Sequence, residues 1–572
     1  MTIQNQEIAR LFNRYAILLE IDRANAFRVR AYRNAARLIE NLPRSIAEML
    51  ASGEDLSELP GIGKDLAHKL AEIVHSGSLA ELGEIEKRIP GALADLADVP
   101  GLGPKRVKRL YDVLRIKSMA DLAVAARRGK LHRLEGFGPK LEQTILKATE
   151  AHATGAGRIG LLAAEQIADG LIEYLKSVPG SGRVTVAGSF RRRRETVGDL
   201  DVLVTARNSA KIIAAFTAYE EVAEVSSKGT TRASVKLKSG LQVDLRVMEE
   251  KSYGAALVYF TGSKNHNIQL RLLGIKRNLK INEYGVFRGE RWLAGRTEKD
   301  IYARVGLPFI EPELRENTGE IEAARAGKLP KLVTLKNIRG DLHTHTVASD
   351  GNGTVEDMAR AAVERGYEYI AISDHTKHLG ITHGLDAKQL ARQMNAIDRL
   401  NAKWPGIRIL KSAEVDILPD GKLALDGKVL ADLDFVIAAV HTKFNLSADA
   451  QTERIIRAMD NPVVNIIAHP TGRLIGDREA YALDMARLMK AALERRCHLE
   501  VNGQPSRLDL NDSHCRMAKQ MGLRLALGTD AHSPETLRYM RYAVDQARRG
   551  WLEPKDVLNT KPWPRLKMLL AR

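Results

Sequence analysis

Cysteine is nearly absent from this chain of 572 residues, which contains two, Cys497 and Cys515. Neither belongs to a Cys-x-x-Cys pair, so the sequence provides no disulfide framework and no cysteine-based zinc site, and it fits a reducing compartment. The sequence also lacks an N-terminal signal-peptide pattern and any apolar run long enough to span a membrane. We therefore expect a cytoplasmic protein without a membrane partner.

Acidic residues are outnumbered by basic ones, which gives a formal net charge of +17. Residues 1–338 contain 54 basic and 41 acidic residues, a net charge of +13, whereas residues 339–572 contain 34 and 30, a net charge of +4. This basic excess predicts a polyanionic partner for the first part, with a general solubility bias as the alternative. The length predicts about three to five domains.

Two aspartates stand one residue apart at Asp199 and Asp201, after a glycine–serine turn and four arginines. Residues i and i+2 of a strand point to the same face, so the two carboxylates project side by side. They repel each other unless a cation lies between them, and a hard cation such as Mg²⁺ suits carboxylate oxygens. Ser189 and the arginines supply donors for phosphate. The segment 188–201 therefore predicts metal-dependent phosphoryl transfer on a nucleotide.

A third carboxylate is predicted on a neighbouring strand. Residues 234–238 and 241–247 form an expected hairpin in which alternate residues of the second strand are apolar. Asp244 then lies on the polar face with Gln242 and Arg246. A third carboxylate ligand is what a two-metal phosphoryl-transfer site needs.

Residues 2–85 are expected to be helical, with helices at 5–22 and 26–41. Three turns between residues 59 and 140 repeat an apolar-Gly-apolar-Gly pattern before a helix, at 59–70, 99–110 and, more weakly, 134–140. Glycine permits the tight turn, and the helix start exposes backbone N–H groups to a phosphate. The pattern resembles the helix–hairpin–helix motif, which binds the DNA backbone without reading sequence. The expected DNA contacts are Gly61, Gly63, Lys64, Gly101, Gly103 and Lys105.

These features together resemble the family X DNA polymerases. The residues that carry the resemblance are Gly188-Ser189, Arg192, Gly198-Asp199-Leu-Asp201, Asp244 and Tyr259-Phe-Thr-Gly-Ser263. The resemblance implies a helical lyase-like domain at 1–88, fingers at 89–152, a palm at 153–260, a thumb at 261–316 and a linker at 317–338. It further implies that Asp199, Asp201 and Asp244 bind catalytic Mg²⁺ or Mn²⁺.

The same resemblance implies a set of nucleotide contacts. They are Arg158, Gly188, Ser189, Arg192, Gly198, Tyr259, Phe260, Gly262, Asn267 and Arg271. Lys69 matches the family's Schiff-base lysine for removing a 5′-deoxyribose phosphate, although a solvated helix lysine is the alternative. The chain departs from better-known members at four positions, which leave the metal ligands intact but affect nucleotide affinity, fidelity and the lyase pocket. They are Gln242 for arginine, Val197 for serine, Lys264 for an acidic residue and Asn34 for lysine.

The sequence after residue 338 alternates apolar strand-like runs with helical stretches, such as 355–365 and 481–496. This alternation predicts a parallel sheet closed into a barrel, with its site at the carboxyl ends of the strands. The seven runs are 338–345, 369–375, 407–414, 435–441, 464–469, 498–502 and 523–530. Six of the seven end in histidine, aspartate or glutamate.

The potential metal ligands at these strand ends mix imidazole and carboxylate groups, which suits Zn²⁺, Mn²⁺ or Fe²⁺. They are His343, His345, Asp350, His375, Glu414, His441, His469, Asp530 and His532. Such a set could hold two or three ions. Over residues 339–572 it resembles the polymerase and histidinol phosphatase (PHP) domain, whose implied chemistry is hydrolysis of phosphate esters by a metal-activated water. Lys443 and Arg473 are candidate phosphate contacts.

The complete chain thus resembles bacterial-type family X DNA polymerases with a C-terminal PHP domain. The resemblance implies gap filling in DNA repair, including base excision repair, with dNTPs and gapped or nicked duplex DNA as partners. It implies 3′-to-5′ exonuclease and 3′-end phosphoesterase activity in the PHP domain, and cleavage at abasic sites as an additional activity. We expect a monomer. Two alternatives stay open, a DNA-end-binding scaffold with weak catalysis and a PHP domain that acts on a small phosphate ester.

Overall fold

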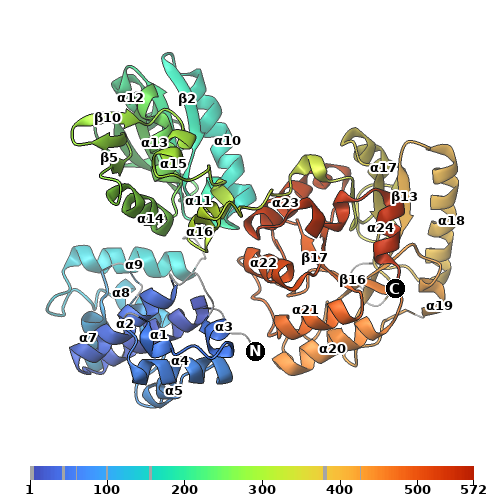
Figure 1. The fold of residues 1–572 in the computed structure, drawn as a ribbon, viewed down its shortest axis with the longest axis horizontal. Coiled ribbons are helices and arrows are strands. Elements are labelled where there is room, and N and C mark those ends of the chain that lie inside the picture. The colour runs from blue at the N-terminus through green and yellow to red at the C-terminus, as the bar shows by residue number, and fades with distance from the viewer. Residues whose placement is uncertain are drawn as a thin grey trace. The chain divides into compact units, whose positions relative to one another are not determined.

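The computed structural model describes residues 5–40, 46–59, 61–97, 99, 101–153, 158–377, 383–425 and 427–572. The chain divides into two compact units. The first contains residues 1–159 with the short segments 238–241 and 317–322, and the second contains the remainder. Figure 1 displays both along the chain. No helix among the described residues is both long and apolar enough to cross a membrane.

The first unit is helical, as the sequence predicts. Its helices are α1 (Asn5–Ile21), α2 (Ala26–Glu40), α3 (Ile46–Ala51), α4 (Lys64–Ser76), α5 (Ala80–Glu86), α6 (Leu93–Leu96), α7 (Pro104–Leu114), α8 (Met119–Arg127) and α9 (Pro139–Ala153). They enclose one apolar core, in which the Phe12 and Tyr15 rings pack edge-on against Tyr32. Aromatic pairs prefer this geometry because the positive ring edge meets the negative ring face.

The three glycine turns of this unit have the same backbone geometry. Gly61, Gly101 and Gly136 have φ values of +84°, +83° and +84°, a region that side chains with a Cβ rarely adopt. Each turn is closed by a backbone hydrogen bond from the apolar residue that follows the glycine, and each of these residues is buried. The third turn, the weakest in sequence, is therefore equivalent in structure. Pro60 and Pro100 of the first two turns lie outside the described residues.

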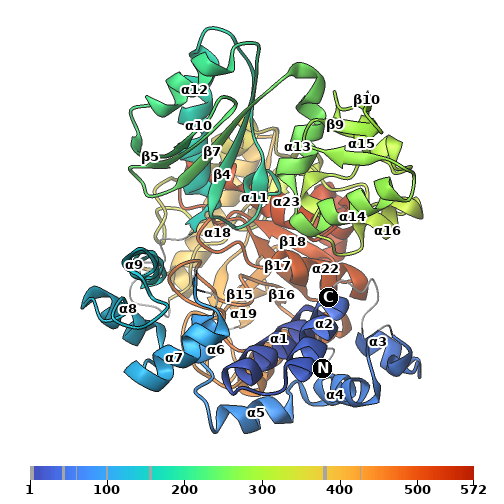
Figure 2. The same cartoon turned by 90° about the vertical axis from the view of Figure 1, so that its left-hand side faces the viewer.

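The first sheet of the second unit has the strand order β2-β4-β7-β6-β5. These strands are β2 (Ser181–Val186), β4 (Asp199–Ala206), β5 (Val222–Lys228), β6 (Arg232–Leu237) and β7 (Gln242–Met248). Strands β4 and β7 are parallel neighbours (Figure 2), whereas the other pairs are antiparallel. Helices α10 (Leu161–Ser177) and α12 (Ser209–Thr217) pack against this sheet. A short helical turn, α11 (Gly188–Arg191), connects β2 toward β4, where the sequence indicated a simple turn.

A small α/β segment follows this sheet. Its elements are α13 (Tyr253–Thr261), α14 (Lys264–Ile275), the sheet of β8 (Lys280–Asn282), β9 (Gly285–Arg288) and β10 (Arg291–Ala294), and α15 (Glu298–Arg304). Helix α13 is apolar and packs Ala256 and Leu257 against Leu203 of β4. The predicted linker contains a short helix of its own, α16 (Glu320–Arg325).

The C-terminal part is a parallel barrel with a broken strand. Its strands are β11 (Gly340–Asp341), β12 (Tyr369–Ile372), β13 (Arg408–Lys411), β14 (Glu414–Asp416), β15 (Val436–Ala439), β16 (Val464–Ile467), β17 (His498–Asn502) and β18 (Leu525–Gly528). They form sheets of three and five strands, and the predicted run 407–414 contains β13 and ends at the first residue of β14. The bridges His375–Glu414 and Thr344–Ala531 join the two sheets on both sides. The predicted seven-stranded barrel is therefore confirmed.

Helices surround the barrel, and one of them closes the end opposite the carboxyl ends of the strands. The surrounding helices are α17 (Val355–Glu364), α18 (Ala387–Lys403), α19 (Gly427–Leu430), α20 (Ala448–Asp460), α21 (Met485–Glu494), α22 (Asp512–Met521) and α23 (Met540–Arg549). The last helix, α24 (Trp563–Leu570), packs Leu566 and Leu570 into the barrel interior. Asn465 Nδ2 donates to the Leu570 carbonyl at 2.7 Å, at the start of β16. The carboxyl ends of the strands are thus left for a site.

Candidate active sites

Three carboxylates lie on the polar face of the first sheet. Asp199 and Asp201 occupy alternate positions of β4, while Leu200 and Val202 between and after them are buried. Asp244 on β7 is the register partner of Asp201. The parallel β4–β7 pairing therefore brings together the three carboxylates that the sequence predicted as metal ligands.

The three carboxylates repel one another. Burial and the charges of Asp199 and Asp244 raise the pKa of Asp201 to about 7. Ser234 Oγ donates to Asp244 Oδ1, and Gln242 Nε2 donates to Asp244 Oδ2 at 2.9 Å. The departure at Gln242 thus replaces a cation with a neutral donor. Repulsion among unpaired carboxylates is what a divalent cation would relieve, so this donor set fits Mg²⁺ or Mn²⁺.

Gly188 is required by the close approach of the α11 turn to these carboxylates. Its φ is +62°, and a Cβ built on it would lie 2.6 Å from Asp201 Oδ2. Ser189 follows in α11, and Gly198 directly precedes β4. Arg192 ends the turn, and its Nη1 donates to the Thr261 carbonyl at 2.5 Å. A Cβ on Gly262 would lie 3.3 Å from that nitrogen, so this position also has little room.

The remaining predicted nucleotide contacts lie on or beside α13 and α14. Tyr259 is 38% exposed, and Phe260 is covered by the Arg246 guanidinium, 4.6 Å above the ring centre. Asn267 Nδ2 donates to the Tyr259 carbonyl at 2.6 Å. Arg271 is exposed on α14. Arg158 is also exposed but belongs to the first compact unit.

Lys69 lies on α4 with its side chain 7% exposed. Its Nζ lies 2.6 Å from Asp65 and 3.1 Å from Glu81, and 5.6 Å from the Tyr32 ring centre. Burial lowers the pKa of Lys69, but Asp65, Tyr32 and Glu81 outweigh it and raise the pKa above its ordinary value. The amine is therefore held protonated, which opposes nucleophilic attack. The solvated helix lysine that the sequence offered as the alternative is not what the structure contains.

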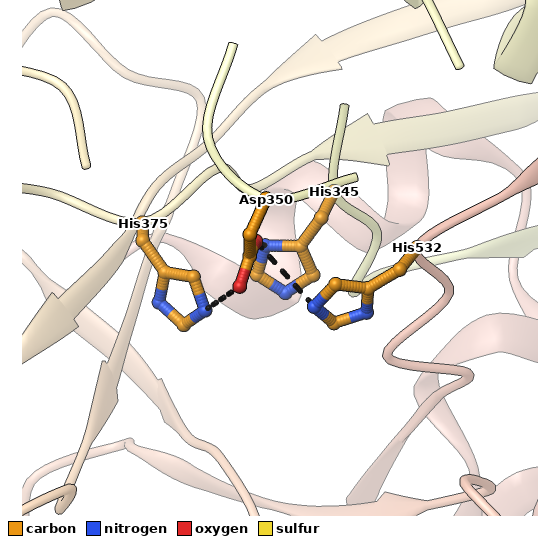
Figure 3. A group of neighbouring side chains, drawn as sticks. All are labelled: His345, Asp350, His375 and His532. Atoms are coloured by element: carbon orange, nitrogen blue, oxygen red, sulfur yellow. Dashed lines mark ion pairs between the residues drawn. The ribbon is translucent and has the colours of Figure 1, made fainter. Parts of the chain in front are cut away.

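The nine predicted ligands of the barrel converge at the carboxyl ends of the strands. Eight of them form three overlapping groups, and the donor atoms of each group lie within 4.8 Å of one another. The ninth, His469, lies 2.9 Å from Glu414. The groups are His345, Asp350, His375 and His532; His343, His345 and Asp530; and His375, Glu414 and His441. Figure 3 shows the first group, in which the three imidazoles surround Asp350. No such group includes Asp199, Asp201 or Asp244 among the described residues.

Glu414 is the common neighbour within the barrel cluster. Its carboxylate is 1% exposed and lies 3.1 Å from His375, 3.3 Å from His441 and 2.9 Å from His469. The same carboxylate lies 3.4 Å from His343 and 3.6 Å from His345. Burial raises the pKa of a carboxylate, but the surrounding imidazoles hold the pKa of Glu414 well below its usual range. Burial lowers the pKa of His441, but Glu414 and Asp416 outweigh it and raise this pKa to about 9.

Two ring nitrogens of the cluster fit metal ligands because they are buried and lack other partners. The Nδ1 atoms of His345 and His469 have no hydrogen-bond partner among the described residues. His345 Nδ1 lies 3.9 Å from Asp350 Oδ1, beyond hydrogen-bond distance. The Nε2 atoms of His343 and His345 lie 3.1 Å apart. Nitrogens and carboxylates aimed at common points suit Zn²⁺, Mn²⁺ or Fe²⁺.

The structure adds residues around the ligands that the sequence reasoning missed. Glu500 on β17 accepts from His343 Nδ1 at 2.7 Å and from the His469 backbone N–H. Asp416 accepts from His441 Nδ1 at 2.8 Å. Each of these carboxylates follows an apolar residue on its strand. This alternation of apolar and acidic residues could have revealed both in the sequence. Such partners fix the orientation of ligating imidazoles.

The arginine nearest to this cluster is not the predicted one. Arg507 Nε lies 3.4 Å from Asp530 Oδ2, so a cation lies at the edge of the ligand set. Arg473 instead forms a bidentate pair with Glu195, at 2.8 and 3.0 Å, and donates to the Arg507 carbonyl. Lys443 is exposed. The guanidinium of Arg473 is therefore occupied, and Arg507 is the better candidate for a phosphate contact.

Comparisons with known proteins cover the same regions. Family models match a helix-hairpin-helix domain at 3–79, a SAM-like helix-hairpin-helix tandem at 93–151, a DNA polymerase beta palm at 158–267, a DNA polymerase beta thumb at 256–316 and a PHP domain at 341–503. The "DNA polymerase/3'-5' exonuclease PolX" of Bacillus subtilis (strain 168) is 38% identical over 574 residues, with both chains covered completely. The chain belongs to the PolX family of family X DNA polymerases. The predicted family and multidomain fold class are confirmed.

The C-terminal part of this PolX-family chain also has shorter relatives. A protein named "Probable phosphatase" of Thermoanaerobacter sp. (strain X514) is 32% identical over 232 residues, which are 38% of this chain and 89% of that protein. Another so named, from Edwardsiella ictaluri (strain 93-146), is 30% identical over 247 residues, 41% of this chain and 94% of that protein. Both matches fit a metal-dependent phosphoesterase domain joined to a DNA-binding polymerase.

Proposed function

We propose that this PolX-family enzyme fills short gaps in duplex DNA with dNTPs and trims 3′ ends in its PHP domain. The observation that carries the proposal is the presence of two complete and separate ligand sets in one chain. Asp201 and Asp244 are register partners beside Asp199, and eight further ligands meet at the barrel, with His469 next to Glu414. Together with membership of the family, this supports polymerisation and 3′-to-5′ hydrolysis as opposing reactions at two sites.

In the polymerase site we assign the three aspartates to two Mg²⁺ or Mn²⁺ ions. In the barrel the nine residues would hold two or three Mn²⁺, Zn²⁺ or Fe²⁺ ions. Bound there, the ions would supply positive charge against the phosphate and lower the pKa of the attacking hydroxyl or water. In the first reaction the primer 3′-hydroxyl attacks the α-phosphate of the dNTP, and pyrophosphate leaves. In the second, water attacks the terminal phosphodiester, the P–O3′ bond breaks, and a nucleoside monophosphate and a shortened primer with a 3′-hydroxyl are released.

The chain's own side chains orient the substrates in this proposal. Arg192 and Ser189 bind the triphosphate, and Gly188 allows the backbone to approach it. Tyr259 and Phe260, with Gly262, line the sugar. Asn267 and Arg271 meet the base and the template side, and Arg158 is a further assigned triphosphate residue.

The proposed DNA contacts lie at the repeated turns. Gly61, Gly63 and Lys64 open α4, and Gly101, Gly103 and Lys105 open α7, where backbone N–H groups and ammonium groups can meet phosphates. Their identical geometry supports a non-specific grip on the duplex backbone. Gapped or nicked DNA, a monomeric state and a cytoplasmic location belong to the same proposal.

Primer extension and primer degradation measured on one gapped duplex with Mg²⁺ or Mn²⁺ test the two-site assignment. Asp199→Ala should abolish extension alone, and His343→Ala should abolish degradation alone. Asp169→Asn and His498→Ala are matched controls. Asp169 is exposed on α10. His498 lies at the start of β17, where its Nδ1 donates to the Arg524 carbonyl. Survival of both activities in either site variant would contradict the assignment.

A small phosphate ester is a second candidate substrate of the barrel, supported by the relatives named as phosphatases. Hydrolysis of p-nitrophenyl phosphate that exceeds primer degradation, and that disappears in His343→Ala, would favour it. A protein that binds gapped DNA but extends and degrades nothing would instead fit the scaffold alternative.

A further inference from the structure

The four-arginine turn of the polymerase site contacts a helix of the PHP barrel. Within the second compact unit, Asp545 of α23 lies 3.3 Å from Arg193, and Arg549 of α23 donates to the Arg192 carbonyl. Each arginine of the turn is paired with carboxylates. The pairs are Arg191–Glu298, Arg192–Glu316, Arg193–Glu165, Arg193–Asp545 and Arg194–Glu316. The turn is therefore an ion-pair hub rather than a free basic patch.

Arg192 is the member of this hub to which we assign the triphosphate. Its Nε donates to Glu316 Oε1 at 3.0 Å, and its side chain is 14% exposed. A carboxylate thus occupies the guanidinium that the nucleotide would use. Because one guanidinium face cannot serve two anions fully, the incoming triphosphate has to compete with Glu316.

Besides Arg192 and Arg194, Glu316 has a cationic partner that comes from the PHP barrel. Arg549, the last residue of α23, donates from Nη1 to the same Glu316 Oε1 at 3.0 Å and to the Arg192 carbonyl at 2.7 Å. Its Nη2 donates to Asp512 at the start of α22. The Arg549 side chain is 1% exposed. Two guanidinium groups from different regions of the chain therefore share one carboxylate oxygen.

The two guanidinium groups differ in how firmly they are held. Burial opposes the charge of both, but Asp512 and Glu316 together raise the pKa of Arg549. The pKa of Arg192 is lowered, because burial and the nearby charges of Arg549 and Arg194 exceed the effect of Glu316. Arg192 is thus the partner whose cation is less well compensated, and a polyphosphate would compensate it better.

We propose that Arg549 is a positioning residue for the polymerase reaction, which neutralises Glu316 when Arg192 turns from Glu316 to the triphosphate. The inference rests on the proposed triphosphate contact of Arg192. It gives the PHP barrel a role in nucleotide binding that is separate from its own hydrolysis. Without Arg549, Glu316 would retain Arg192 more strongly, and the nucleotide would bind more weakly.

Single-nucleotide insertion kinetics of the full chain test this role. Arg549→Met should raise the KM for dNTP about tenfold or more with a smaller change in kcat, which is a loss of binding of about 1.4 kcal/mol per factor of ten. Arg548→Met is the matched control, since Arg548 is the preceding residue of α23 and pairs with Glu313 at 2.7 Å. It should leave the KM unchanged. Primer degradation should persist in both variants.

Removal of the competing carboxylate should reverse the defect. Adding Glu316→Gln to Arg549→Met should return the KM to within about threefold of the unmutated enzyme, and Arg549→Lys should give an intermediate value and serves if the methionine variant does not fold. Equal KM changes in the two α23 variants, or a double variant without recovery, would overturn the inference. Arg192→Ala separates the two proposals: an unchanged KM there would refute the triphosphate role itself. A raised KM in Arg192→Ala with a normal KM in Arg549→Met would refute only the role of Arg549.

Discussion

The two ligand sets of this PolX-family chain differ in what neutralises their carboxylates. In the palm sheet, burial and the charges of Asp199 and Asp244 outweigh Arg246 and Arg192 and raise the pKa of Asp201 to about 7. In the barrel, imidazoles surround Glu414 and hold its pKa well below its usual range. The first set is acidic and partly open, and the second is mixed and buried.

This difference indicates how each site acquires its metal. A mixed imidazole–carboxylate set is close to charge balance and already oriented by Glu500 and Asp416, so it can hold ions without a substrate. Three carboxylates on an open sheet face bind ions more weakly, and Mg²⁺ usually arrives with substrate phosphates. We therefore expect the barrel to retain metal through purification and the palm to exchange it at each turnover.

Removing one central carboxylate from each site should separate the sites most strongly. Glu414→Gln should reduce primer degradation about a thousandfold or more and lower the metal content of the protein, because one side chain contacts five histidines. Asp244→Asn should reduce extension by a similar factor while the retained metal stays unchanged. Activity assays and metal analysis of the same preparations measure both. Metal loss in Asp244→Asn would contradict the contrast between retained and exchanging ions.

Outer neighbours of the ligands should matter in the barrel more than in the palm. Asp416→Asn removes the carboxylate that orients His441, and we expect a loss of about 10- to 100-fold in metal affinity. Ser234→Ala removes the hydroxyl that donates to Asp244, and extension should change less than about threefold because Gln242 still donates to that carboxylate. Metal titrations followed by degradation and extension rates provide the readouts. Comparable losses in the two variants would show that both sites depend equally on their surroundings.

Burial of Asp201 and repulsion from its neighbours predict a pH-dependent stability that one substitution should remove. The pKa of Asp201 is raised above that of an unfolded aspartate, so its favourable contribution is complete below pH of about 4 and is lost as the pH rises through about 7. In chelator-treated protein, Asp201→Asn should therefore raise the stability at pH 8 by about 1–2 kcal/mol and change it little at pH 4. Thermal unfolding at the two pH values measures the effect. A stabilisation that is equal at both values would exclude repulsion as its cause.

The sequence predicted both ligand sets because each follows a local rule. Alternation along a strand places Asp199 with Asp201 and Asp244 with Gln242, and ligands at the carboxyl ends of successive strands meet when the barrel closes. The glycine turns were likewise predictable, since Gly61 and Gly101 need a positive φ that few other residues adopt. The positions and the fold class therefore follow from patterns within short segments.

What the sequence could not provide was the choice among charged partners far apart in the chain. Arg473 was expected beside a phosphate, but it pairs with Glu195, 278 residues away. Arg191 and Arg193, expected as donors for phosphate, likewise pair with Glu298 and Asp545. Ion-pair selection depends on packing between remote elements, and every basic residue has many possible partners in a sequence.

Lys69 provides the test with the smallest expected effect, because it is a buried cation whose charge is already balanced by neighbouring carboxylates. Asp65 and Glu81 hold the amine protonated, whereas attack on an abasic-site aldehyde requires the neutral amine. We expect little borohydride-trapped adduct with 5′-deoxyribose-phosphate DNA, and Glu81→Gln should increase it a few-fold by relaxing that pair. Glu84→Gln is the control, since Glu84 lies on the same helix and pairs with the exposed Lys87. Abundant adduct in the unmutated protein that vanishes in Lys69→Ala would show instead that DNA binding releases the amine from its carboxylates.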